Sequence, residues 1–89
     1  MTERTRRILK FTLGPWTNVI TADEPRCLAV GVQGDDIVLW AEASIGDGVI
    51  TRFVAVPTGQ DAPGDDSAYI GTAQLPGPLV FHVYRLTRS

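Results

Sequence analysis

An alternation of apolar and polar residues with a period of two runs through most of the chain and limits its fold more than any other feature. In "ILKFTL" (8–13), every second residue from Leu9 onward is a large apolar one. Successive side chains of an extended strand point to opposite faces, so this period indicates strands with one buried face. The pattern predicts six strands, at residues 8–13, 27–32, 36–43, 48–57, 68–75 and 79–86. The shorter run 17–22 is a candidate for a seventh.

Glycine, proline and aspartate interrupt the alternating segments at regular intervals, where the chain is expected to reverse. These interruptions are "GPW" (14–16), "DEP" (23–25), "GDD" (34–36), "GDG" (46–48) and "PGP" (76–78). The pair "GD" at 34–35 predicts a tight hairpin, and "LPGP" (75–78) predicts a hairpin between the last two strands. Short strands with turns about every ten residues predict an all-β fold, a small antiparallel β-sandwich or flattened barrel of six to seven strands.

The 89 residues are expected to form a single all-β domain spanning 1–89, with residues 1–6 flexible. The longest stretch without strand character is "PTGQDAPGDDS" (57–67), in which Ala62 is the one residue of the apolar class outside proline and glycine. Long loops in compact domains are either functional or mobile, so this segment is predicted to be the one real loop of the fold.

The charge distribution argues against a nucleic-acid partner. The formal net charge is −2, and the sequence pI is about 5.1. A nucleic-acid-binding domain usually has a basic pI and a basic face. Here the basic residues gather near the two ends of the chain, at Arg4, Arg6, Arg7, Lys10, Arg85 and Arg88. We interpret them as solvated strand ends.

The cysteine count and the hydropathy pattern bear on location. Cys27 is the single cysteine, so no internal disulfide can form, and its alternating apolar neighbours predict a small buried thiol. No apolar run approaches the roughly 20 residues of a membrane-spanning helix. The charged start "MTERTRRILK" is not followed by a signal-peptide core. We therefore expect no membrane partner and a cytoplasmic location.

His82 is the single histidine and stands in the apolar run "LVFHVY" (79–84). In a regular strand it shares a face with Val80, Tyr84 and Leu86. Three interpretations are open: a half-buried histidine held by a backbone or threonine partner, a histidine that contacts a ligand on a concave sheet face, or a catalytic base. The first is favoured over the second, and the third is the least supported.

Metal and catalytic chemistry find little support in the residue types present. A metal site would require further histidine, cysteine or acidic ligands at suitable spacing, and the sequence does not contain such a set. No arrangement of nucleophile, base and orienting group is recognisable. We predict no catalytic residues, no metal, no cofactor and no enzymatic activity. Most carboxylates lie in predicted turns; Glu42 lies within a strand, where Arg52 of the following strand is its expected partner.

Aromatic and neutral polar residues in the predicted strands suggest a binding site. Apolar walls with a few hydrogen-bonding groups are typical of small-ligand pockets and of oligomer interfaces, although aromatic residues of a small domain also fill its core. The candidate ligand-binding residues are Trp40, Tyr69, Thr72, Gln74 and His82. Thr58 and Gln60 of the long loop are expected to form a lid over them.

The segment "VLWAEAS" (38–44), and "FVAVPTGQDAPGDDSAYIGTAQLPGPLVFHVYRL" (53–86) after it, resemble a family of small phage and prophage proteins of uncharacterised function. The family pattern has a "K-(F/Y)-x-L" strand, an "LWA"-like strand, a "GTGH"-like turn, "Y-(I/L)-G-T-x-Q", a glycine hairpin and a closing "LVFHVF". The likeness covers about residues 8–86. It matches the pattern at Trp40, Gly59, Tyr69, Gly71, Thr72, Gln74, Phe81 and His82.

One departure from that pattern concerns the turn before the long loop. Where the family has a histidine after "GTG", this chain reads "PTGQ" and places Gln60. A histidine pair, if the family uses one, is therefore incomplete here, which weakens the case for metal or acid–base chemistry further. The resemblance implies a phage origin and a location in the host cytoplasm, and it implies no mechanism.

Two functional hypotheses from different classes follow. The first is a non-enzymatic accessory phage protein that binds a host protein or a small molecule and modulates host physiology or defence. The second is a structural or assembly component, a virion or decoration protein that acts through self-association. Apolar residues on both faces of the central strands leave surplus surface to cover, so we expect a homo-oligomer, with a dimer as the first expectation.

Overall fold

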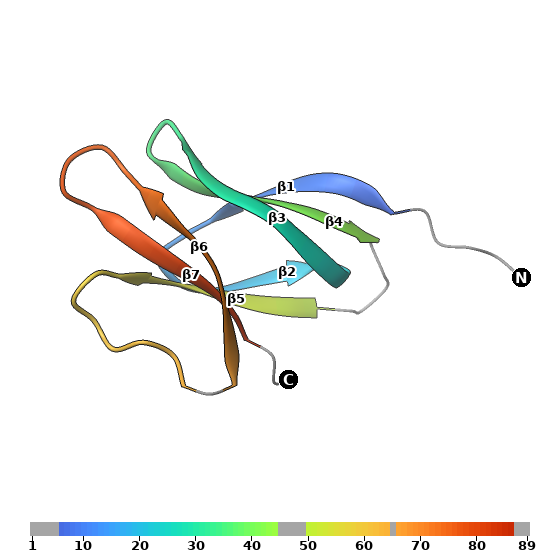
Figure 1. Cartoon of the computed structure of the whole chain (residues 1–89). Coiled ribbons are helices and arrows are strands. Elements are labelled where there is room, and N and C mark those ends of the chain that lie inside the picture. The colour runs from blue at the N-terminus through green and yellow to red at the C-terminus, as the bar shows by residue number, and fades with distance from the viewer. Residues whose placement is uncertain (1–5, 45–49, 65, 87–89) are drawn as a thin grey trace, which may run out of the picture.

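The computed structural model describes residues 6–44, 50–64 and 66–86, and these contain seven strands and no helix (Figure 1). The strands are β1 (Arg7–Leu13), β2 (Trp16–Thr21), β3 (Asp23–Gln33), β4 (Asp36–Ser44), β5 (Ile50–Pro57), β6 (Ser67–Gln74) and β7 (Val80–Leu86). The predicted all-β class is thus confirmed, and the run 17–22 does form part of a strand.

Two antiparallel sheets pack face to face, and neither closes into a barrel. The first has the strand order β1–β4–β3, and the second has the order β2–β5–β7–β6. In Figure 1 the three-stranded sheet lies above the four-stranded one, and the chain passes from one to the other between β1 and β2. Of the two predicted architectures, the structure is the sandwich.

The core lies between the sheets and is formed by alternate residues of each strand. Leu39 of β4, Phe53 of β5 and Val83 of β7 are fully buried, and they belong to one apolar cluster with Leu13 and Phe81. A domain of this size buries only about 60–65% of its unfolded surface, and the other described residues that are shielded this completely are mostly alanines. The residues that alternate with this cluster point to the two outer faces.

Both hairpins predicted from glycine-containing turns are present. Gln33 pairs with Asp36, which leaves a two-residue turn at 34–35, and Gly34 there has φ +60°. In the β6–β7 hairpin, the Leu75 amide donates to the Leu79 carbonyl over 2.8 Å. A residue with a side chain rarely adopts the positive φ of Gly34, which explains the glycine in the turn at 34–35.

The predicted reversal at 23–25 is wrong, because β3 already begins at Asp23. The chain changes sheets next to Ala22, and Pro25 lies inside the strand, where the register shifts between Asp23 and Arg26. Proline is tolerated at such a position because β3 is an edge strand and an irregular ladder does not need every amide. A second shift between Cys27 and Ala29 leaves Leu28 exposed, whereas a regular alternation would place Leu28 on the core face with Val30.

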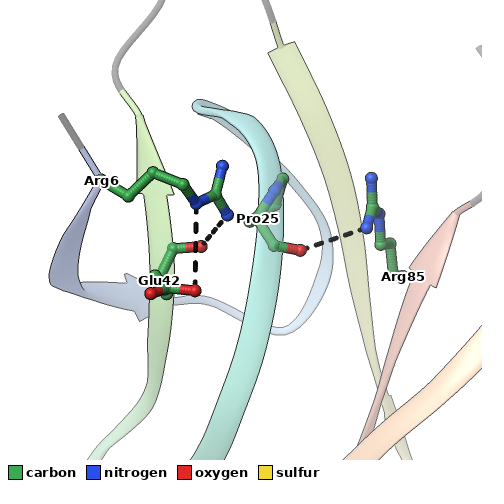
Figure 2. A network of polar contacts seen from close by, with 4 residues as sticks. All are labelled: Arg6, Pro25, Glu42 and Arg85. Carbon is green, nitrogen blue, oxygen red and sulfur yellow. Dashed lines mark hydrogen bonds and ion pairs between the residues drawn. The ribbon is translucent and has the colours of Figure 1, made fainter. Parts of the chain in front are cut away.

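The expected partner of Glu42 is also wrong. Its carboxylate lies 3.9 Å from Nε of Arg6, and the Arg6 guanidinium donates to the Glu42 carbonyl over 2.9 Å (Figure 2). Arg52 belongs to β5, in the other sheet, because sequence neighbours β4 and β5 do not pair. The turn predicted at 46–48 and the flexibility predicted for 1–6 lie outside the described residues, Arg6 excepted.

Candidate functional site

The predicted site residues of the last two strands gather on the outer face of the four-stranded sheet. Thr72 of β6 is the direct cross-strand partner of His82 of β7, and Tyr69 is the partner of Tyr84. His82 and Tyr84 alternate with the buried Phe81 and Val83, so their side chains point away from the core. His82 is thus a half-buried residue of a pleated sheet.

A β-bulge in β6 brings Tyr69 and Thr72 to the same face. The register shifts between Tyr69 and Gly71, so that Ile70 is the extra residue. Without the shift, Tyr69 and Thr72 would point to opposite faces, because their separation of three residues is odd. With it, the Tyr69 hydroxyl lies 2.5 Å from Oγ1 of Thr72.

Both ring nitrogens of His82 are hydrogen-bonded to threonine hydroxyls. Nδ1 lies 3.0 Å from Oγ1 of Thr72, and Nε2 lies 2.7 Å from Oγ1 of Thr58. The Thr58 hydroxyl also donates to the Val80 carbonyl over 3.5 Å. If Thr58 donates there, a neutral imidazole carries its proton on Nε2 and accepts at Nδ1 from Thr72, which in turn accepts from Tyr69. The hydrogen bonds then run in one direction from the Tyr69 hydroxyl to the Val80 carbonyl.

The start of the long loop, residues 57–60, lies beside this face. Thr58 anchors it through its amide, which donates to the Val80 carbonyl over 3.0 Å. A shallow pocket of about 110 Å³ remains between loop and sheet. It is lined by Val56, Pro57, Thr58, Gly59, Gln60, Ala62, His82 and Tyr84. Val56 points outward from β5, yet it is only 4% exposed.

Two tyrosines form the outer end of the site. The rings of Tyr69 and Tyr84 meet edge to face, with centroids 5.6 Å apart and an interplanar angle of 69°. Aromatic pairs prefer this arrangement because the positive ring edge meets the negative ring face. Tyr69 nevertheless remains 58% exposed. It therefore presents a large aromatic surface to solvent in an orientation that its neighbours hold.

The structure does not bring Trp40 to this site. Trp40 lies on β4 of the other sheet, between the buried Leu39 and Ala41, and so points to the outer face of that sheet. Its ring lies over Gly31, where a Cβ would come within 2.9 Å of it. Gln74 does lie on the His82 face, opposite Val80. Tyr84 was not among the predicted site residues, although its spacing of two from His82 already placed it on the same face.

Cys27 is half-buried beside the end of the sandwich, where Arg85 reaches from one sheet to the other. The Arg85 guanidinium donates to the Pro25 carbonyl over 3.2 Å (Figure 2). Burial raises the pKa of the Cys27 thiol above its ordinary value of 9.0, and the positive charge of Arg85 opposes this rise. A thiol in this environment is mostly protonated at neutral pH, and the thiolate is the reactive form.

Nowhere in residues 6–44, 50–64 and 66–86 do three or more histidine, cysteine or acidic side chains gather as metal ligands would. The same part of the chain has no helix able to span a bilayer.

Comparison with known proteins places the chain in a family. The model of a domain of unknown function, DUF7352, matches residues 4–89. The chain belongs to this family. No curated protein and no solved structure matches it. The match includes the whole four-stranded sheet and the long loop, so the His82 face is part of the family domain.

Proposed function

We propose that this chain is a non-enzymatic accessory phage protein that binds a protein partner in the host through the outer face of its four-stranded sheet. The binding surface consists of Tyr69, Thr72, His82 and Thr58, and Tyr84 packs against the ring of Tyr69. The phage origin and host location rest on the sequence resemblance described above. The choice of a binding role and of this surface rests on the geometry of the site.

The observation that carries the proposal is the hydrogen-bond chain that ends at an exposed tyrosine. Tyr69 is held by Thr72 at its hydroxyl and by the edge of Tyr84 at its ring. Tyrosine is enriched at protein interfaces because it offers a large contact area with little rotamer freedom to lose. A side chain already fixed in place loses less entropy when a partner binds.

The use of both His82 nitrogens supports binding over catalysis. A general base needs a nitrogen free to take a proton from a substrate, or a hydrogen bond that the substrate can replace. In His82 the two nitrogens hold the loop on one side and β6 on the other. The imidazole thereby acts as a cross-link between three segments of the surface.

Pocket size favours a protein partner over a small molecule. Pockets for drug-sized ligands have volumes of about 300–1,000 Å³. The pocket beside His82 measures about 110 Å³. The exposed Tyr69 lies outside its lining, so the larger part of the candidate surface is an open sheet face of the kind that another protein can cover.

The test is affinity capture from infected host cells, with quantitative mass spectrometry of what is retained. We expect a specific protein to bind the natural chain and to be lost at least about tenfold on Tyr69→Ala, because truncation of an interface tyrosine commonly costs 1–2 kcal/mol or more. Ile8→Ala is the matched control, since Ile8 is 69% exposed on the other sheet.

Three outcomes contradict the proposal. One is equal capture by the natural chain and the Tyr69→Ala variant. Another is a small molecule that co-purifies with the natural protein and is lost on His82→Ala. The third is abundance of the chain in purified virions, which supports the alternative role as a structural or assembly component.

A further inference from the structure

Strand β2 (Trp16–Thr21) is an open edge of the four-stranded sheet. It pairs with β5 on one side, and no other described strand pairs with it on the other. Such an edge presents free amide and carbonyl groups, and natural proteins protect it with charges, proline, bulges or covering segments. The sequence "WTNVIT" contains no charged residue, no proline and no glycine, and its ladder with β5 has no register shift.

The other three edge strands each carry at least one protective feature. β1 has Arg7 and Lys10, so two copies of it would place like charges close together. β3 contains Pro25 and two register shifts. β6 is bulged, and its Gly71 lies directly against Val30 of β3. Among the described strands β2 is thus the one with an unprotected, uncharged edge.

Exposed apolar side chains accompany this edge. Val19 is 56% exposed, and Ile50, its diagonal neighbour on β5, is 46% exposed. Both belong to the outer face, since they alternate with buried or inward-facing residues such as Phe53. At the start of the strand Trp16 is 49% exposed and has φ +67°, which is unfavourable for a bulky side chain. Large apolar groups on a free edge are costly unless something covers them.

We propose that a second copy of the chain covers this edge, by antiparallel pairing of β2 with β2 of the partner about a two-fold axis. The two four-stranded sheets then form one continuous sheet of eight strands. An uncharged strand suits this pairing, because in a two-fold contact the same patch of both subunits meets itself. A charge on that patch would therefore lie near a like charge. A different protein that binds through opposite charges would instead require charged residues on β2, and β2 has none.

The register of this pairing follows from the two-fold axis and the exposed residues. Residues directly opposite each other in an antiparallel pair point to the same face, so an outward residue of one copy must lie opposite an outward residue of the other. The two-fold axis therefore lies between one residue and the same residue of the second copy. With the axis at Val19, its side chain meets Val19 of the partner subunit, and Thr17 lies opposite Thr21 of the partner subunit. Paired β-branched residues and threonine–threonine contacts stabilise antiparallel strands.

The dimer has a consequence for the candidate binding surface. A two-fold axis that relates antiparallel strands of one sheet is perpendicular to that sheet, so both outer faces lie on the same side. The strand order places β6 at the edge farthest from β2. The two Tyr69 surfaces therefore lie near opposite ends of one extended face. Dimerisation itself does not depend on the proposed function, because its test is the mass of the purified protein.

The first experiment is sedimentation velocity at high micromolar concentration. We expect the natural chain to sediment at twice its mass of 9.6 kDa. Val19→Lys should weaken the dimer at least about tenfold, because it places like charges opposite each other at the axis. Ile8→Lys, at a still more exposed apolar position on β1, should leave the dimer unchanged. Circular dichroism verifies that both variants are folded.

A second experiment tests the same contact without a destabilising charge. In a Cys27→Ala background, Val19→Cys should form an intermolecular disulfide on mild oxidation, because directly opposite residues of antiparallel strands lie 4.5–5.5 Å apart at Cα. Ile8→Cys is the control and should not cross-link. A monomeric natural chain, a dimer that survives Val19→Lys, or failure of Val19→Cys to cross-link overturns the proposal.

Discussion

The hydroxyl of Thr58 lies 2.7 Å from Nε2 of His82, although 24 residues separate them in the chain. This contact joins the start of the long loop to the last strand of the sandwich. The other ring nitrogen of His82 contacts Thr72 of β6. A single imidazole thus connects the loop, β7 and β6, and removing it should loosen all three.

His82→Ala is expected to lower the free energy of unfolding by about 1–2 kcal/mol, because it removes two partly exposed hydrogen bonds. It should also speed amide hydrogen exchange at Thr58 and Gln60, which denaturant titration and exchange mass spectrometry can measure. Thr72→Val is the control, since it breaks the β6 contact and leaves the loop contact in place. Unchanged exchange of the loop in His82→Ala would show that His82 does not anchor it.

Asn18 holds the corner between β1 and β2. Its amide donates to the carbonyls of Gly14, over 2.8 Å, and Trp16, over 3.0 Å, and its Oδ1 accepts from the Gly14 amide over 2.8 Å. We expect Asn18→Ala to cost about 1–3 kcal/mol of unfolding free energy, since the three bonds are exposed but hold the unfavourable Trp16 backbone.

Asn18→Asp is the matched comparison at this corner. Aspartate keeps the acceptor for the Gly14 amide, but its second oxygen would face the Gly14 and Trp16 carbonyls where the natural side chain donates. Asn18→Asp should therefore be no more stable than Asn18→Ala. Urea denaturation measures all three. Equal stability of Asn18→Ala and the natural chain would mean that the side chain does not stabilise the corner.

Gly71 of β6 lies directly against Val30 of β3, in the other sheet. A Cβ there would come within 3.0–3.1 Å of the Val30 side chain, including its Cβ, which cannot rotate away. We expect Gly71→Ala to lower the unfolding free energy by about 1–3 kcal/mol through overpacking, despite the better strand propensity of alanine. Gly64→Ala is the control, because nothing lies within 4 Å of its Cβ position. A stabilised Gly71→Ala variant would contradict the contact.

The raised pKa of Cys27 predicts that stability falls at alkaline pH. The unfolded chain releases the thiol proton near the ordinary pKa of 9.0, whereas the folded chain keeps it to higher pH. The folded state then binds more protons than the unfolded state, so the free energy of unfolding decreases as pH rises past 9.0. Below that pH the contribution is fully present.

Comparison of the natural chain with Cys27→Ala isolates this contribution, because all other titrating groups are shared. The difference in unfolding free energy should be constant below pH 9 and should change in favour of Cys27→Ala above it. Alkylation by iodoacetamide at pH 8 should be slower in the folded protein than in urea. Arg85→Gln should slow it further, since Arg85 favours the thiolate. Equal rates in the folded and unfolded protein would contradict a shielded thiol.

Much of the local structure was predictable from the sequence. The two-residue period depends on the pleat of each strand alone, so it identified six strands and a candidate seventh, and it placed His82 and Tyr84 on one face. The turns at 34–35 and 75–78 were predictable because glycine tolerates a positive φ and proline fixes its own φ, and both effects are local. Thr58 contacts His82 and Gln60 lines the pocket beside it, whereas Trp40, Tyr69, Thr72 and Gln74 do not line that pocket.

Tertiary structure decided which strands became neighbours outside the two predicted hairpins, and no local pattern carries that information. Glu42 contacts Arg6 instead of Arg52, because β4 and β5 belong to different sheets. Trp40 of β4 lies apart from His82 for the same reason, since β7 is in the sheet of β5. The bulge at Ile70 depends on pairing with β7, yet it places Tyr69 beside Thr72. Alternation is a property of one strand, whereas strand order and register minimise the free energy of all strands packed together.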